Sequence, residues 1–154
     1  MKGPLFAYQR AGSLADVFRL MAAAGPDAKL LAGGQSLVAT LAFRLSEPST
    51  LIDITRVREL EGITDSGGSI RVGALTTHAE LGRDALIRSH VPLVAEAVPL
   101  IAHAAIRNRG TIGGSLAFAD PAAELPAVAV ALEAHVDAVA GGAWLVGHNR
   151  FAAA

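Results

Sequence analysis

Two glycine doublets, each with a hydroxyl side chain close behind, constrain this chain more than any other feature of its sequence. The chain carries them in Ala32-Gly33-Gly34-Gln35-Ser36-Leu37 and in Thr111-Ile112-Gly113-Gly114-Ser115, here named the first and the second glycine segment. Glycine has no Cβ, so its backbone can adopt a positive φ and approach a ligand closely. Free N–H groups in such a turn, followed by a helix N-terminus, form an anion site. The two segments therefore predict a diphosphate held from two sides.

The first doublet alone is more typical of a structural turn than of a ligand site, because Gly-Gly turns between a strand and a helix are common. Neither segment fits the GxGxxG dinucleotide fingerprint, and the sequence contains no phosphate-binding lysine motif of the Walker type. The recurrence of the same glycine and hydroxyl pattern is what favours phosphate binding over a structural role.

Charged residues flank the second glycine segment. Arg107 and Arg109 precede it and could add positive charge to a diphosphate site, or they could pair with surface acids. Asp120 and Glu124 follow it, one helical turn apart, and could accept hydrogen bonds from ribose hydroxyls. The same two acids would also be favoured simply by the dipole of a helix N-terminus.

Composition excludes several classes of function. The 154 residues are 52% hydrophobic with a net charge of −1, and no block of lysine or arginine suggests a nucleic-acid partner. The sequence has no cysteine, so this chain cannot itself hold an iron–sulfur cluster or a thiolate metal site. Its five histidines are scattered without the spacing of a metal site, although a Ser-His-Asp arrangement stays open. No signal peptide or membrane-spanning run is apparent, which favours a cytoplasmic location.

The pattern of residues 1–56 predicts a β-α-β-α-β lobe. Strands are expected over residues 5–8, 29–31 and 50–54. A first helix is expected to start at Ser13 and stop at Gly25, and a second to start at Ser36. The second helix would carry leucines at 37, 41 and 45 on one face and end before Pro48.

The pattern of residues 57–154 predicts a second lobe. A hairpin is expected from strands 60–64 and 69–72, and a capping box over residues 77–80 opens a short helix. Further helices are expected from Pro92 and from Pro121, with a turn-rich stretch over residues 104–119 between them. A strand over 135–139 would then turn at Gly141-Gly142 into residues 143–146.

Five blocks in this order resemble one known family. They are the first glycine segment, residues 51–54, residues 73–78, residues 106–115 and residues 119–126. Together the blocks resemble the FAD-binding medium subunit of molybdenum hydroxylases, the carbon monoxide dehydrogenase and xanthine dehydrogenase family. The resemblance covers nearly the whole chain, and five ordered blocks are more specific than any single glycine turn.

The resemblance implies an α+β, two-lobed FAD-binding fold of the vanillyl-alcohol oxidase (PCMH) type. Residues 1–56 would form the first lobe, and residues 57–154 a second lobe that is C-terminally incomplete. Both glycine segments would contact the pyrophosphate of FAD, Glu124 would hold the adenosine portion, and Asp120 is a further candidate. No catalytic residue and no metal ligand is expected in this chain.

The same resemblance implies the place of the chain in an electron-transfer complex. A large molybdenum-cofactor subunit would oxidise the substrate, and a small [2Fe-2S] subunit would pass electrons to the FAD, which delivers them to an external acceptor. The alternative is a non-catalytic nucleotide-binding or assembly fragment of such a complex.

Overall fold

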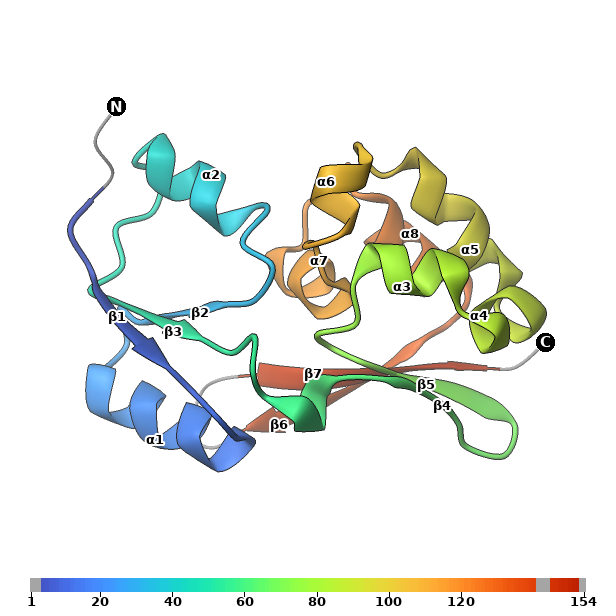
Figure 1. Cartoon of the computed structure of the whole chain (residues 1–154), viewed down its shortest axis with the longest axis horizontal. Coiled ribbons are helices and arrows are strands. Elements are labelled where there is room, and N and C mark those ends of the chain that lie inside the picture. Colours follow the sequence, from blue (N-terminus) through green and yellow to red (C-terminus); the bar gives the residue numbers. More distant parts are fainter. Residues whose placement is uncertain (1–3, 141–144, 153–154) are drawn as a thin grey trace.

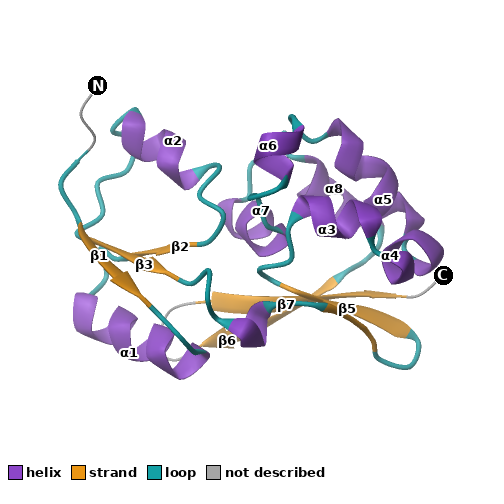
Figure 2. Cartoon of the chain, in the orientation of Figure 1, coloured by secondary structure: helices purple, strands orange, loops and turns teal. Residues whose placement is uncertain are grey.

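The computed structural model describes residues 4–140 and 145–152, and it has the predicted α+β character, built around two separate sheets (Figures 1 and 2). The first sheet and its helices comprise β1 (Ala7–Arg10), α1 (Leu14–Ala24), β2 (Lys29–Leu31), α2 (Leu37–Ala42) and β3 (Thr50–Asp53). The remaining elements are η1 (Arg58–Leu60), β4 (Ile63–Asp65), β5 (Ser69–Gly73), α3 (His78–Arg83), α4 (Ala85–His90), α5 (Pro92–Ala97), η2 (Val98–Leu100), α6 (Ala104–Arg107), α7 (Ile112–Phe118), α8 (Glu124–Ala131), β6 (His135–Ala140) and β7 (Leu145–Ala152).

The first sheet is parallel, with β3 between β1 and β2. All four residues of β3 are buried, as expected for the central strand of a sheet covered on both faces. Helices α1 and α2 lie on opposite sides of this sheet (Figure 1). Helix α1 begins where the Ser13 side chain accepts a hydrogen bond from the Asp16 N–H, and it ends at Gly25 with φ of 81°. The β-α-β-α-β order predicted for this part of the chain is confirmed.

The carboxylate of Asp53, at the end of β3, links this strand to β1 through side-chain hydrogen bonds. Its Oδ2 accepts from the Arg10 Nε at 3.0 Å and from the Tyr8 hydroxyl. Its Oδ1 accepts from the Thr55 hydroxyl at 2.6 Å and from the Thr55 N–H at 2.8 Å. A buried carboxylate needs such donors, because burial without them disfavours its charged form.

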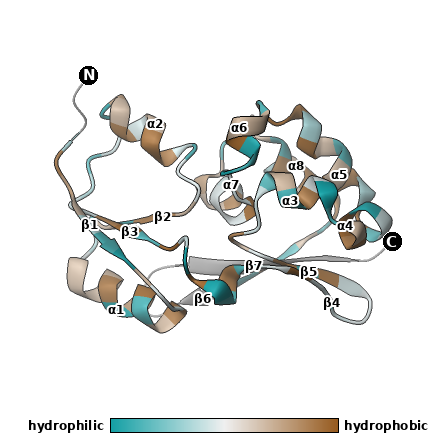
Figure 3. Cartoon of the chain, viewed as in Figure 1, coloured by the Kyte–Doolittle hydropathy of each residue, from teal (hydrophilic) through white to brown (hydrophobic). Residues whose placement is uncertain are grey.

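The second sheet is antiparallel, in the order β4-β5-β7-β6. The predicted β4–β5 hairpin is confirmed, and Gly67 and Gly68 both have positive φ in its turn. Helices α3 to α8 gather on one side of this sheet (Figures 1 and 2). Figure 3 shows both hydrophobic and hydrophilic residues along α1, whose buried residues Val17, Leu20 and Met21 have the spacing of a helix that buries one face. The turn predicted at Gly141-Gly142 lies outside the described residues.

Two hydrophobic clusters form the core. The first joins α1 and β3 to residues beyond position 56, since Leu60, Ala74 and Leu75 pack in the same cluster as Ile52. The second lies between β5 and helices α3, α4, α5, α7 and α8. The division into lobes at residue 56 stays a proposal, and the first core crosses it. Within the described ranges, each helix is too short or too polar to traverse a lipid bilayer.

The structure corrects several predicted boundaries. Strand β1 starts at Ala7, so the strand predicted over residues 5–8 is shifted toward the C-terminus. Helix α2 ends at Ala42, because Arg44 adopts a positive φ, and Leu45 is therefore largely exposed instead of sharing the helix face. Helix α8 begins at Glu124 and not at Pro121, because the preceding residues form a turn.

Residues 104–119, which the sequence predicts to be rich in turns, are largely helical. They contain α6 and α7, and both glycines of the second segment lie inside the first turn of α7. The Thr111 hydroxyl caps this helix by accepting from the Gly114 N–H. A side-chain cap and the tertiary contacts of this region compensate for the low helix propensity of glycine.

Candidate functional site

The two glycine segments come together although they are far apart in the sequence. A Cβ built on Gly33 would lie 1.9 Å from the carbonyl oxygen of Arg109 and 3.0 Å from the Cα of Gly110. The loop from β2 to α2 therefore packs directly on the backbone that leads into the second segment. Figure 1 shows this loop facing α6 and α7. Only glycine allows so close an approach at position 33.

The first glycine segment offers unpaired backbone donors. Within the described ranges, the N–H groups of Gly33, Gly34, Gln35 and Ser36 have no protein acceptor. Gly34 has φ of 75°, and the Gln35 side chain braces the turn by donating to the Gly33 carbonyl at 3.1 Å. Ser36 occupies the start of α2 without making the predicted side-chain cap, so its exposed hydroxyl is available. Unpaired donors on successive residues are a typical anion site.

The second glycine segment differs, because its N–H groups already donate within the protein. The Ile112 N–H donates to the Thr76 carbonyl at 3.0 Å and the Gly113 N–H to the Ala74 carbonyl at 2.9 Å. The two that follow, Gly114 and Ser115, donate to the side chain and carbonyl of Thr111. The expectation of free N–H groups here is wrong, since these residues build a helix turn instead of preceding one.

Fewer groups of the second glycine segment are therefore available to a ligand than the sequence predicts. Ile112 is buried in the second core, and a Cβ on Gly113 would lie 2.6 Å from the Cβ of Ala74, so both are packing positions. Gly114 is exposed, with only the Thr111 hydroxyl oxygen near its Cβ position. The Ser115 hydroxyl beside it is partly exposed.

His78, which the sequence reasoning assigned no role, lies against this segment. Its Nε2 is 3.1 Å from the Ser115 Oγ, and its Nδ1 is buried without a hydrogen-bond partner. Its backbone N–H donates to the Gly110 carbonyl at 2.9 Å, and Thr77 forms an isolated bridge with Thr111. Burial lowers the pKa of His78, with Arg107 acting in the same direction, against opposing effects of the Thr111 backbone and Glu124. The one sequence signal that could have pointed to His78 is its position in the capping box, directly after Thr77.

The charged residues that flank the second segment separate into two groups. Glu124 is partly buried, and its negative charge opposes the lowering of the pKa of His78 by burial. Asp120 is exposed, and its Oδ1 accepts from the Ala122 N–H at 2.9 Å, which closes the turn before α8. The Arg107 guanidinium donates to the carbonyls of Ile101 and Ala102, a structural role.

A cavity of about 420 Å³ lies where the segments meet. Gly33, Arg109 and Thr111 line one part of it, and acidic side chains of Glu61 and Glu80 line another. A third carboxylate, that of Asp84, also lines the cavity, and these acids do not suit an anion. The groups that suit an anionic bridge are the unpaired N–H donors of residues 33–36, of which only Gly33 lines the cavity, and the Ser115 hydroxyl. The residues present therefore fit the diphosphate of a dinucleotide.

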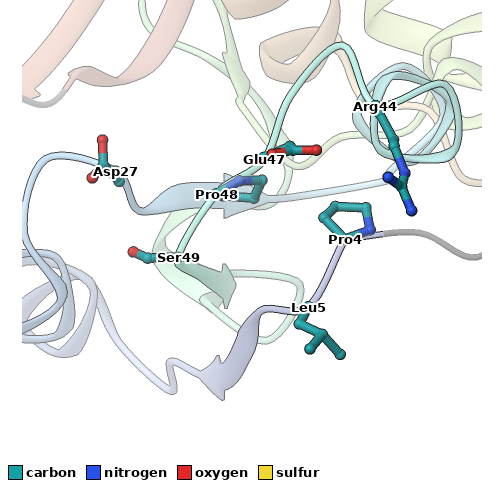
Figure 4. Close-up of a pocket in the computed structure, with 7 residues that line it drawn as sticks. All are labelled: Pro4, Leu5, Asp27, Arg44, Glu47, Pro48 and Ser49. Carbon is teal, nitrogen blue, oxygen red and sulfur yellow. The ribbon is translucent and has the colours of Figure 1, made fainter.

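A second hollow of about 510 Å³ lies away from both glycine segments. Figure 4 shows its walls, which come from the start of the chain, the turn before β2 and the segment between α2 and β3. It contains Asp27, Arg44 and Glu47 but no residue of either glycine segment, so it is not the candidate site. In the part of the chain that the structure describes, no group of three or more acidic or histidine side chains could hold a metal ion.

Comparison with known proteins identifies the family of the chain. Residues 4–145 match the family model described as "FAD binding domain in molybdopterin dehydrogenase". The chain is 54% identical over 138 residues to the 6-hydroxypseudooxynicotine dehydrogenase complex subunit alpha of Paenarthrobacter nicotinovorans, covering 90% of this chain and 47% of that protein. It is 42% identical over 132 residues to the carbon monoxide dehydrogenase medium chain of Hydrogenophaga pseudoflava, covering 86% of this chain and 46% of that protein.

A solved structure matches equally well. All of this chain superposes on 61% of a chain of quinoline 2-oxidoreductase from Pseudomonas putida 86, with a TM-score of 0.95 and 35% sequence identity. The chain thus spans about half the length of the curated relatives it matches. The family model, the sequence similarity and the shared fold agree, and the chain belongs to the family of FAD-binding domains of molybdopterin dehydrogenases.

Proposed function

We propose that this chain is the FAD-binding part of the medium subunit of a molybdenum-dependent hydroxylase or dehydrogenase. The observation that carries the proposal is the row of unpaired N–H groups over residues 33–36, which faces the second glycine segment across a Gly33–Arg109 contact. Membership of the FAD-binding family supports the same ligand. Two relatives are a subunit of a dehydrogenase complex and the medium chain of a dehydrogenase, which supports a role in a larger enzyme.

The residues of this chain would share the work of holding FAD. The N–H groups of the first segment, with the Ser36 hydroxyl, would donate to phosphate oxygens, and Ala32 and Leu37 would flank that turn. Across from them, Thr111, Gly114 and Ser115 would present their surface to the same diphosphate, with Ile112 and Gly113 packing behind. Glu124, and more weakly Asp120, would accept hydrogen bonds from the adenosine ribose. Bound FAD supplies a flavin that takes up and releases electrons.

The partners proposed are a large molybdenum-cofactor subunit and a small [2Fe-2S] subunit, in a cytoplasmic complex. Because these 154 residues include no cysteine, thiolate-held clusters would lie outside them. Electrons would reach the flavin from the small subunit and leave to an external acceptor.

The test is direct binding of FAD to the purified chain, followed by flavin fluorescence, with heat release and chromatography to identify the bound flavin. Gly34→Ala and Gly67→Ala form a matched pair, since both glycines have positive φ but only Gly34 lies at the site. We expect Gly34→Ala to weaken FAD binding and Gly67→Ala to leave it unchanged. A folded wild-type chain that binds no FAD would refute the proposal.

Co-expression with the two partner subunits distinguishes the electron-transfer role from the alternative, a non-catalytic assembly fragment. A flavin that the large subunit's substrate reduces supports the electron-transfer role. A complex that assembles and holds a nucleotide, but whose flavin is never reduced, would instead indicate a non-catalytic assembly fragment.

A further inference from the structure

His78 occupies an unusual position for a histidine with no assigned role. It is 4% exposed, and a Cβ on Gly110 would come within 2.9 Å of its Cε1, so the ring is held closely on that side. Its backbone is fixed as well, through the Gly110 carbonyl and the bridge between Thr77 and Thr111. The ring therefore has a single orientation, with Nε2 directed at the Ser115 Oγ.

The environment of the ring selects one tautomer. Burial lowers the pKa of His78, so the ring is neutral near neutral pH and carries one proton. A proton on Nδ1 would be a buried N–H without an acceptor, because Nδ1 has no partner in the described part of the chain. A proton on Nε2 instead donates to the Ser115 Oγ at 3.1 Å. The Nε2–H tautomer is therefore the one that satisfies the buried donor.

This tautomer determines what the Ser115 hydroxyl can do. Since its oxygen accepts from His78, its own proton cannot be given back to the ring. The structure gives Ser115 Oγ no second hydrogen-bond partner among the described residues. Ser115 is partly exposed beside the open surface of Gly114, so this proton is available to a ligand.

We propose that His78 is a positioning residue, whose Nε2–H holds the Ser115 hydroxyl as a donor to a phosphate oxygen of the bound dinucleotide. This inference rests on the proposed function, because it assigns the diphosphate as the acceptor. It also explains why a buried histidine is placed behind a segment whose N–H groups are already paired. The hydroxyl supplies the donor that the helix turn no longer can.

A double-mutant cycle tests the inference on the full chain, with ADP and FAD as probes. His78→Leu and Ser115→Ala should each raise the dissociation constant for ADP about tenfold, the effect of one hydrogen bond to a charged group. The double variant should bind no more weakly than Ser115→Ala alone, because His78 acts through Ser115. His78→Gln, which places an amide N–H near the former Nε2, should restore most of the affinity. The exposed His103→Gln serves as the control and should bind as the wild type does.

NMR of the wild-type imidazole provides a readout that does not depend on the folding of a variant. The ring nitrogens should report the Nε2–H tautomer, and their signals should shift when ADP binds. A wild-type chain that binds ADP but has the proton on Nδ1, or shows additive effects in the cycle, would overturn this inference alone. A wild-type chain that binds neither probe would overturn the proposed function and this inference with it.

Discussion

Gly33 and Arg109 are in direct backbone contact: a Cβ at position 33 would stand 1.9 Å from the Arg109 carbonyl oxygen. This contact joins the loop after β2 to the residues that lead into α7, and the cavity with both glycine segments in its wall lies beside it. The geometry of the candidate site therefore depends on the absence of a Cβ atom at position 33.

Gly33→Ala should destabilise the protein by about 1–3 kcal/mol, the usual cost of overpacking a well-packed site. The contacting atoms belong to backbone, so neither partner can rotate away. Urea unfolding measures the loss, and FAD titration should show weaker binding. Gly12→Ala is the matched control, because its Cβ would meet only the Asp16 carboxylate at 4.0 Å. Equal stability of the two variants would contradict the contact.

The two glycines of the second segment should respond differently to the same change. Gly113→Ala places a Cβ 2.6 Å from the Ala74 Cβ and should lower the melting temperature, by about 2–4 °C for each kcal/mol lost. Gly114→Ala meets only the Thr111 hydroxyl oxygen, so it should affect stability less and ligand binding more. Thermal melts of the two variants with and without FAD compare their stability and their ligand binding. The reverse order would show that Gly114 is the packing residue.

Asp53→Asn should cost about 2 kcal/mol of unfolding free energy near neutral pH, the linkage value of its shifted pKa. Burial raises the pKa of Asp53, but hydrogen bonds from Thr55, Tyr8 and Arg10 outweigh it and lower the pKa from 3.8 to about 2. The folded pKa lies below the unfolded one, so the stabilisation is complete above the unfolded pKa and is lost as the pH falls through the folded pKa.

Urea unfolding over a pH series checks this dependence. The difference between wild type and Asp53→Asn should shrink as the solution is acidified from the unfolded toward the folded pKa. Asp27→Asn, at an exposed carboxylate, is the control and should show no such difference. A constant difference across the series would mean that the charge of Asp53 is not what stabilises the fold.

Glu124→Gln should weaken ADP and FAD binding about tenfold, the effect of losing a charged acceptor for ribose hydroxyls. Binding of flavin mononucleotide, which has no adenosine, should not change. Calorimetric titration of the three ligands makes the comparison, with the exposed Glu96→Gln as the control. A loss of affinity for flavin mononucleotide as well would place Glu124 elsewhere in the site.

The sequence predicted the first sheet well, because its helix caps and stops are local signals: Ser13 and Gly25 bound α1 as expected. The sequence did not predict α7, because a Gly-Gly pair is typical of a turn. The hydrogen bonds that fix the start of this helix go to the carbonyls of Ala74 and Thr76, which are far from it in the sequence. For the same reason it could not foresee that the donors of the second segment are already used. His78 was missed because its partner, Ser115, is close only in the folded structure.

Backbone NMR of the chain during titration with ADP tests the central claim most directly, that the first glycine segment supplies free N–H donors to a diphosphate. We expect the largest amide shifts on Gly33, Gly34, Gln35 and Ser36, while the signal of the Gly113 amide, which already donates to the Ala74 carbonyl, shifts little. Saturable binding with those four amides unmoved, or with the shifts centred on the hollow around Asp27 and Arg44, would contradict it.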